Sequence, residues 1–355
     1  AVIDKNCLLG TANFPLLDGV TLPEDRADLY VMWGDEKRAG IDMMIGSNLD
    51  EIRYFVPTEG GEEGFLDTLR WIAKRDRALL NDQEKAMYDE FMATLKKYDV
   101  EVCALAAHGN ALHPDKAIAA QFDKDFRNAV LLAEKMGVDT VITFSGCPGD
   151  HEGAKYPDWV TCPWPEDFLA ILDWQWNEKV IPYWKEAGAF ALAHNVPHIA
   201  FEMHPGFCVY NPATLLRLRE AVGPVIGANF DPSHLVWQGM DPVAAIRELK
   251  GAIYHVHAKD TKIDKYNTAA NGVLDTKHYS DELNRSWIFR TVGYGNGETY
   301  WRDLVSNLRL CGYDRVLSIE HEDSIMTIDE GLSKAVAFLK GVCIFEEKPT
   351  TMSWA

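Results

Sequence analysis

The chain has 355 residues, of which 47% are hydrophobic, and its formal net charge is -19. That length and composition suffice for one large domain with a sizeable core, and no apolar run approaches the roughly 20 residues of a membrane-spanning helix. The acidic balance argues against nucleic acid as a partner, because phosphate backbones bind to basic surfaces.

The seven cysteines are scattered, odd in number and without a C-x-x-C pair. That spacing is typical of reduced thiols and disfavours a thiolate zinc site. The first residues lack the basic-then-apolar pattern of a signal peptide. Together these features predict a cytoplasmic protein that does not associate with a membrane.

Residues 1–95 lack the regular alternation of strand and helix patterns found in the rest of the chain. A turn-rich stretch at 13–25 is followed by a short strand pattern at 41–47 and, after a glycine-rich loop, by helical patterns near 64–78 and 82–98. We expect this part to form an atypical N-terminal segment.

From about residue 100, strand and helix patterns alternate about six times. Strands are expected near 102–107, 140–144, 198–203, 225–230, 252–258 and 315–320. Helices are expected near 116–136, 178–194, 211–222, 241–249, 300–311 and 328–342. Because the strands are apolar throughout, the pattern predicts a parallel sheet covered by helices.

A doubly wound sheet and a (β/α)8 TIM barrel both fit this alternation. Nearly every strand carries ionisable residues at its C-terminal end, which is where barrel sites lie, so we favour the barrel. We place it at residues 96–348, followed by a C-terminal tail at 349–355. Only six strands are clear, so two more would come from the first 95 residues, with 5–13 and 41–47 as candidates.

Four ionisable residues end separate predicted strands, namely Glu202, Asp231, His257 and Glu320. Three carboxylates crowded together would repel one another, and a divalent cation removes that conflict. Oxygen donors with one nitrogen suit Mn²⁺ best, with Mg²⁺, Co²⁺ and Zn²⁺ as substitutes. The alternative is that each acid caps a helix or pairs with an arginine or lysine.

Six further residues near these strand ends are expected to contact a substrate, namely His108, His204, His234, Lys259, Asp260 and Arg290. The alternatives are a histidine near a helix start for His234 and a solvated loop pair for Lys259 and Asp260. His255 shares a strand face with His257, and we expect it to be a core histidine one layer lower. The glycine-rich turn at 292–297 is a candidate for binding substrate, including a phosphate.

Several motifs in this part of the chain point to one family. They are His108-Gly109-Asn110, Thr143-Phe144-Ser145-Gly146, Phe201-Glu202-Met203-His204-Pro205-Gly206, Phe230-Asp231-Pro232-Ser233-His234, His255-Val256-His257-Ala258-Lys259-Asp260 and Leu317-Ser318-Ile319-Glu320-His321-Glu322-Asp323. Residues 95–348 thereby resemble the sugar phosphate isomerase/epimerase family of xylose isomerase-like TIM barrels, which includes endonuclease IV relatives. The resemblance implies a metal held by the four strand-end residues. It also implies that Glu202 and Glu320 act as acid and base on opposite faces of a sugar.

Residues 1–90 resemble instead a piece of a type-B carboxylesterase, through the stretches 18–25 and 44–55. Glu51 would match the acid of that family's catalytic triad. No G-x-S-x-G nucleophile elbow occurs in the sequence, so esterase chemistry is not expected. The chain looks like an esterase fragment fused to a barrel without its own first two strands.

We therefore expect a metal-dependent isomerase or epimerase of a sugar or sugar phosphate, working by proton transfer through an enediolate. One alternative is a metal-dependent lyase, including one that cleaves C-glycosides, acting on an oxidised sugar. Cleavage of abasic DNA is a further alternative, disfavoured by the acidic charge. The last is a non-catalytic fusion relic, whose open barrel edges would favour pairing with another chain, for instance in a homo-oligomer.

Overall fold

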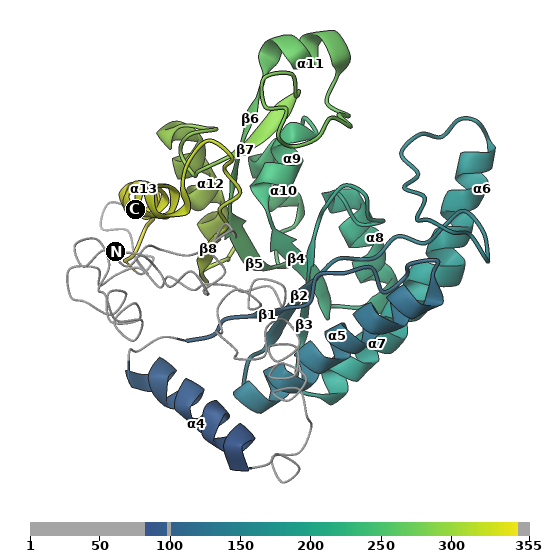
Figure 1. Cartoon of the computed structure of the whole chain (residues 1–355), viewed down its shortest axis with the longest axis horizontal. Helices are drawn as coiled ribbons and strands as arrows, with labels where there is room; N and C mark the ends of the chain where they lie inside the picture. The colour runs from purple at the N-terminus through teal and green to yellow at the C-terminus, as the bar shows by residue number, and fades with distance from the viewer. Residues whose placement is uncertain (1–81, 98–100, 347–355) are drawn as a thin grey trace, which may run out of the picture.

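The computed structural model describes residues 82–97 and 101–346 (Figure 1). The expected strands at 5–13 and 41–47, the carboxylesterase-like stretches with Glu51, and the C-terminal tail at 349–355 lie outside the described residues. Within the described ranges, none of the helices is both long and apolar enough to span a bilayer.

Six parallel strands form the central sheet, in the order β1-β2-β3-β4-β5-β8. They are β1 (Leu105–Ala106), β2 (Thr140–Thr143), β3 (His198–Glu202), β4 (Ile226–Phe230), β5 (Ile253–Ala258) and β8 (Leu317–Ile319). Every neighbouring pair is parallel, so all six strands end at the same edge. The predicted parallel sheet is confirmed, and each of its strands lies within or next to an expected range.

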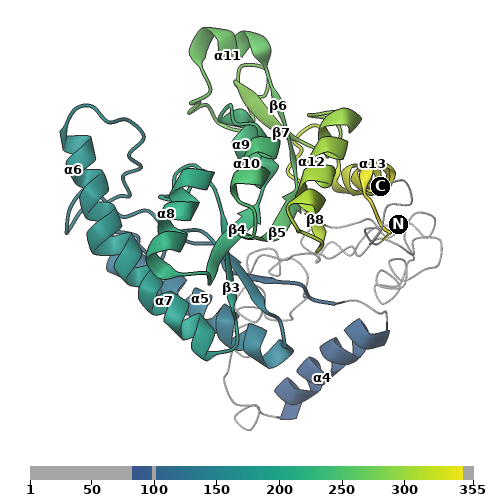
Figure 2. The same ribbon diagram turned by 180° about the vertical axis from the view of Figure 1, so that it is seen from behind.

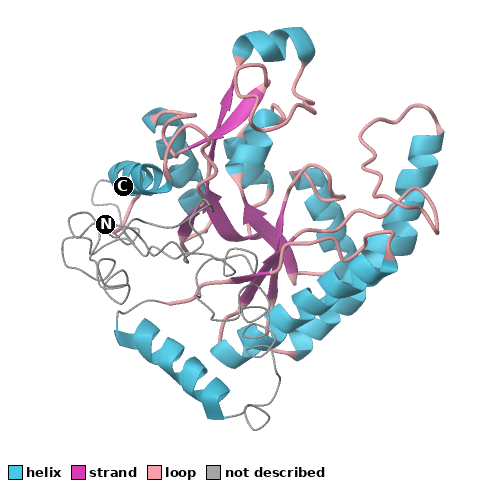
Figure 3. Ribbon diagram, viewed as in Figure 1, coloured by secondary structure: helices cyan, strands magenta, loops and turns pink. Residues whose placement is uncertain are grey.

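Helices α5, α7 and α8 pack against strands β1 to β4 on the outer side of this sheet (Figure 3). The helices of the described residues are α4 (Asp82–Lys97), α5 (Lys116–Met136), α6 (Asp167–Trp174), α7 (Ile181–Ala193), α8 (Pro212–Val222), α9 (Pro232–Trp237), α10 (Pro242–Glu248), α11 (Lys265–Asn271), α12 (Glu298–Leu310) and α13 (Ile328–Val342). Seen from behind, α7 and α8 lie outside β3 and β4 (Figure 2).

Two parts of the fold differ from the expectation. The helix expected near 178–194 begins earlier, because α6 continues through a π-helical segment (Gln175–Val180) into α7. An antiparallel hairpin of β6 (Asp260–Ile263) and β7 (Trp287–Arg290) also follows β5, and it carries α11 away from the sheet (Figure 1). The expected alternation of strand and helix has no place for such a hairpin.

Local sequence signals set the helix ends. The side chain of Asp115 accepts hydrogen bonds from the backbone N–H groups of Ala117 and Ile118 at the start of α5. Gly137 ends that helix with a φ of 73°, a left-handed conformation that favours glycine. Asn211 and Thr214 form a reciprocal capping box at the start of α8.

Aromatic packing fixes the outer helices to the strands. The ring of Trp184 in α7 meets Phe201 of β3 edge-on at 4.5 Å and Phe126 of α5 at 5.4 Å. The indole N–H of Trp184 donates to the carbonyl oxygen of Ser145 at 2.8 Å. Burying each such ring contributes on the order of 1.5–3 kcal/mol, so this cluster holds the end of β3, with Glu202, in place.

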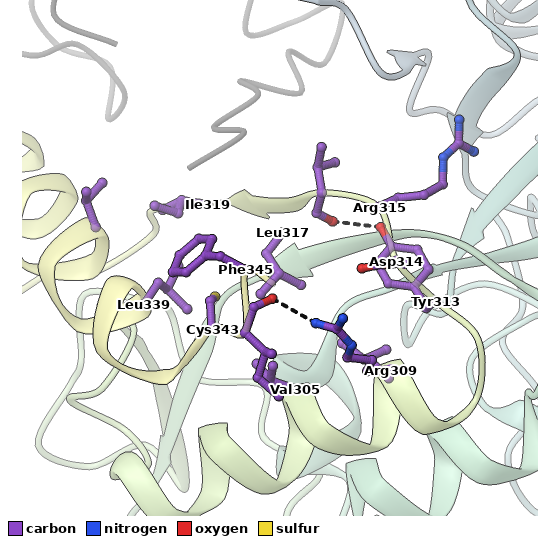
Figure 4. Close-up of a pocket in the computed structure, with 14 residues that line it drawn as sticks. Val305, Arg309, Tyr313, Asp314, Arg315, Leu317, Ile319, Leu339, Cys343 and Phe345 are labelled. Carbon is purple, nitrogen blue, oxygen red and sulfur yellow. Dashed lines mark hydrogen bonds between the residues drawn. The ribbon is translucent and has the colours of Figure 1, made fainter. Parts of the chain in front are cut away.

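Among the described residues, the edge strands β1 and β8 each pair with one strand only. A cavity of about 230 Å³ lies beside β8, between that strand and helices α12 and α13 (Figure 4). Its apolar lining includes Val305, Leu317, Ile319 and Leu339. The described sheet has six strands with two unpaired edges, whereas a closed (β/α)8 barrel has eight strands.

Gly227 offers a test of the packing between β4 and β5. A Cβ at this position would lie 2.2 Å from the ring of Tyr254 and 2.6 Å from the carbonyl oxygen of Ala252. We expect Gly227→Ala to lower the free energy of unfolding by about 1–3 kcal/mol, because a buried strand cannot move aside freely.

The matched control is Gly341→Ala in α13, where a Cβ meets nothing within 4 Å. It should be neutral or stabilise by up to about 1 kcal/mol, because alanine favours helix. Urea denaturation measures the free energy of unfolding of both variants. If Gly227→Ala were as stable as Gly341→Ala, the β4–β5 contact at Gly227 would not be tightly packed.

Candidate metal centre

The four residues predicted to hold a metal meet at the C-terminal edge of the sheet. Glu202 ends β3, Asp231 follows β4, His257 lies near the end of β5 and Glu320 follows β8. One ligand atom from each lies within 4.8 Å of the other three. The shared direction of the strands brings these residues together, although 118 positions separate the first from the last.

The distances are those of a tightly packed ionic cluster. The Nδ1 atom of His257 lies 2.7 Å from Glu320 Oε2, 3.5 Å from Glu202 Oε2 and 4.0 Å from Asp231 Oδ2. The side chains of Glu202 and Asp231 are only 4% and 1% exposed. Buried charges at such distances require compensation by opposite charge.

The protein supplies part of that compensation, as the pKa values indicate. Burial alone would lower the pKa of His257, but the carboxylates, Glu320 foremost, raise it to about 10. Burial raises the pKa of Asp231 to about 7, and Glu202 and Glu320 add to that rise against the lowering effect of Lys259. Burial would also raise the pKa of Glu320, but Lys259 and His257 hold it well below its usual range.

The donor set fits a divalent cation. Among the described residues, no group donates a hydrogen bond to the buried oxygens Asp231 Oδ2 and Glu320 Oε2. Their close contacts are ion pairs with His257, Lys259 and His234. Three carboxylates with one imidazole are ligands that Mn²⁺, Mg²⁺ and Zn²⁺ accept.

Three histidines predicted to contact substrate surround Glu202. His108 Nε2 lies 3.2 Å from Glu202 Oε2, and His234 Nε2 lies 3.1 Å from Glu202 Oε1. The ring of His204 packs on His234 with centroids 4.1 Å apart. Burial, followed by His204 and Lys259, lowers the pKa of His234 to about 3, so a neutral His234 orients Glu202 through its Nε2 atom.

Lys259 also belongs to the cluster, together with a residue that the sequence analysis missed. The Nζ atom of Lys259 lies 2.5 Å from Glu322 Oε2, 3.3 Å from Glu320 Oε1 and 3.8 Å from Asp231 Oδ2. Burial would lower the pKa of Lys259, but these acids raise it well above its usual value. Glu320 and Glu322 both follow β8 in the same motif, and that position at a strand end was the signal that could have identified Glu322.

Asp260 does not point to this cluster. Its Oδ2 atom accepts hydrogen bonds from the backbone N–H groups of Gly293, Gly295 and Asn296 at 2.9–3.1 Å, and from Trp301 Nε1 at 3.3 Å. The carboxylate therefore fixes the glycine-rich turn. This corrects the interpretation of Asp260 as a substrate ligand, and these N–H groups of the turn are not available to a phosphate.

Arg290 is likewise engaged within the protein. Its Nε atom donates to Asp323 Oδ2 at 3.0 Å, and the backbone N–H of Thr291 donates to the same oxygen at 2.8 Å. The Asp323 side chain is fully buried, and the ion pair with Arg290 compensates its charge. The expected role of Arg290 in substrate binding has no support in these contacts.

Asn229 is a further residue that sequence reasoning missed. Its amide nitrogen lies 3.3 Å from Glu202 Oε2 and 3.2 Å from His257 Nε2, and it is fully buried. Below it, His255 Nδ1 donates to Asn229 Oδ1 at 2.8 Å, while His255 Nε2 lies 3.5 Å from the Cys103 sulfur. His255 thus lies one layer under the cluster, as its spacing predicted.

The sequence of the chain is similar to those of several known proteins. A family model described as "Xylose isomerase-like TIM barrel" matches residues 66–342. The chain is 41% identical over 265 residues to the uncharacterized protein YfiH of Bacillus subtilis, with 74% of this chain and 83% of that protein covered. It is 23% identical to the inosose dehydratase of Mesomycoplasma hyopneumoniae, with coverage of 74% and 81%.

A solved structure shares the fold. The probable 3-DHS dehydratase AsbF, involved in petrobactin synthesis in Bacillus anthracis, superposes with a TM-score of 0.52. The superposition covers 84% of this chain and 99% of that one at 15% identity. Likeness at that identity concerns the fold alone.

Cation binding should stabilise the folded protein. We expect MnCl2, added to protein stripped with chelator, to raise the melting temperature, because a ligand at 100 times its Kd adds about 2.7 kcal/mol. Asp231→Asn should lose most of this shift, whereas Glu248→Gln, at an exposed position of α10, should keep it. Absence of a shift with Mn²⁺, Mg²⁺, Co²⁺ and Zn²⁺ alike would contradict the assignment.

Asp260→Asn should destabilise the protein without removing cation binding. The amide replaces a charged acceptor of several N–H groups, and we expect a loss of about 2–4 kcal/mol in urea denaturation. Asp264→Asn is the control, because asparagine caps α11 as well as aspartate does. If the Asp260→Asn variant folded but showed no Mn²⁺-induced rise in its melting temperature, Asp260 would belong to the metal centre after all.

Proposed function

The chain belongs to the family of xylose isomerase-like TIM barrels, and from this premise we propose that it is a metal-dependent carbohydrate isomerase or epimerase. One observation carries the proposal: two glutamates approach a single cation site from different strands. Glu202 comes from β3 and Glu320 follows β8, and β4 and β5 stand between these strands in the sheet. A substrate carbon held between them would meet one carboxylate on each face.

The four residues Glu202, Asp231, His257 and Glu320 would hold the cation. When bound, a divalent cation polarises a carbonyl and stabilises negative charge that develops on the oxygens of the substrate. Manganese is our first choice for a site with oxygen and nitrogen ligands, although magnesium, cobalt and zinc fit the same donors.

The residues of the chain supply the proton transfers. One of the two glutamates, as the carboxylate, removes the proton from the carbon next to the carbonyl. The other, having taken up a proton from solvent, gives it to the opposite face. Return to the opposite face of the same carbon inverts it. Return to the carbonyl carbon isomerises the sugar, as the proton of the neighbouring hydroxyl passes to the former carbonyl oxygen. His108 and His234 hold the two oxygens of Glu202 in place, at 3.2 and 3.1 Å, so that the carboxylate does not rotate away.

Elimination is the second candidate, because of Lys259. The ammonium group is buried and lies 3.3 Å from Glu320 Oε1, so it could protonate a leaving oxygen next to the carbon that Glu320 deprotonates. The relative from Mesomycoplasma hyopneumoniae is named as an inosose dehydratase, which fits such a step. Loss of water, or of an aglycone from an oxidised sugar, would follow from the same first proton transfer.

Deuterium exchange tests the shared step. Cation-loaded protein in D₂O, given a panel of ketoses and 3-keto glycosides, should place one solvent deuterium on the carbon next to the carbonyl of its substrate. We expect Glu320→Gln to slow this exchange by about 10²–10⁴-fold, the usual contribution of a catalytic base. Glu248→Gln should exchange at the wild-type rate, and an equally fast Glu320→Gln variant would exclude Glu320 from the reaction.

Product analysis separates the two reactions. An isomerase or epimerase yields products of unchanged mass, whereas elimination yields a product lighter by one water or a released aglycone. If elimination is the reaction, Lys259→Met should lower product formation by about 10²-fold or more while proton exchange continues. If products keep the mass of the substrate, the dehydratase alternative is excluded.

A further inference from the structure

Lys259 is a buried lysine in the metal centre, and its ammonium group is already paired with carboxylates of the protein. It faces three carboxylates, those of Glu322, Glu320 and Asp231, at 2.5, 3.3 and 3.8 Å. The face of the Phe289 ring covers the ammonium at 4.2 Å. An incoming phosphate would have to displace these acids to reach it.

The other groups that usually bind phosphate near this end of the sheet are also engaged. Backbone N–H groups of the glycine-rich turn donate to Asp260, and Arg290 is matched by the buried Asp323. The exposed Lys262, on the β6–β7 hairpin, donates to the carbonyl oxygen of Gly295. In the part of the chain that the structure describes, no uncompensated cationic side chain therefore joins the cluster around Glu202.

Glu322 adds negative charge on the solvent side of the cluster. Its side chain is 46% exposed, whereas those of Lys259 and Glu320 are 3% and 18% exposed. Four carboxylates then face one ammonium and one divalent cation, which leaves a net negative charge when the histidines are neutral. A negatively charged binding site repels an anionic ligand, and this repulsion lowers the affinity for that ligand strongly.

An apolar wall lies on another side of the cluster. The rings of Phe144 and Phe207 stack with centroids 4.3 Å apart and an angle of 15° between their planes. His108, which contacts Glu202, packs on Phe144 at 4.5 Å. Such a wall suits the C–H face of a sugar or another uncharged ring.

We propose that the site takes an uncharged carbohydrate and discriminates against phosphorylated sugars and sugar acids, with Glu322 as the specificity-determining residue. The inference rests on the proposed carbohydrate function and names its substrate class. Glu322 repels an anionic substrate directly, and it also holds the ammonium of Lys259 that would otherwise attract one.

Matched pairs of ligands test the proposal without requiring turnover. Isothermal titration calorimetry on the cation-loaded full chain compares D-fructose with D-fructose 6-phosphate, and D-ribulose with D-ribulose 5-phosphate. In at least one pair the neutral member should bind about tenfold or more tightly than its ester. Glu322→Gln should reduce that ratio by about threefold or more, and Glu330→Gln, an exposed acid of α13, should leave it unchanged.

The outcomes separate the two levels of the argument. Equal or tighter binding of the phosphate esters by the wild-type protein would overturn the inference and leave an isomerase of sugar phosphates standing. An unchanged ratio in Glu322→Gln would also overturn it, because the discrimination would then arise elsewhere. Failure of every ligand in both pairs to bind would contradict the inference and count against the proposed function as well.

Discussion

The site depends on the charges that offset the mutual repulsion of three closely spaced carboxylates. Glu202, Asp231 and Glu320 offer oxygens within 4.8 Å of one another and of His257. Without a cation, protonated His257 and Lys259 relieve that repulsion. A bound divalent cation would replace the proton on His257, because a metal-ligating imidazole is neutral. Strand pairing and the packing of the core hold these groups together against their repulsion.

Glu320 illustrates how the parts depend on one another. It follows β8, an edge strand that pairs only with β5 among the described residues. On the outer side of the strand, Leu317 and Ile319 pack against the hydrophobic core and line the cavity beside α12 and α13 (Figure 4). From the inner side Glu320 is held by His257 at 2.7 Å and Lys259 at 3.3 Å, so the ionic cluster itself fixes the end of this strand.

Much of this arrangement could be predicted from the sequence, because apolar strands that end in ionisable residues converge in a parallel sheet. That rule located the strands and the four candidate ligands. It failed for Asp260, which adjoins Lys259 in one motif but faces the opposite side and binds a turn more than thirty residues away. Partners so distant in sequence leave no periodic signal, and the β6–β7 hairpin and the orientation of Asn229 were missed for the same reason.

The most direct test of the central claim is crystallographic. Crystals of the full chain grown with MnCl2 should give one strong anomalous difference peak among the carboxylates of Glu202, Asp231 and Glu320 and the imidazole of His257, and crystals of Asp231→Asn should give a weaker one. A strong peak elsewhere on the protein with none among these four residues would contradict the account.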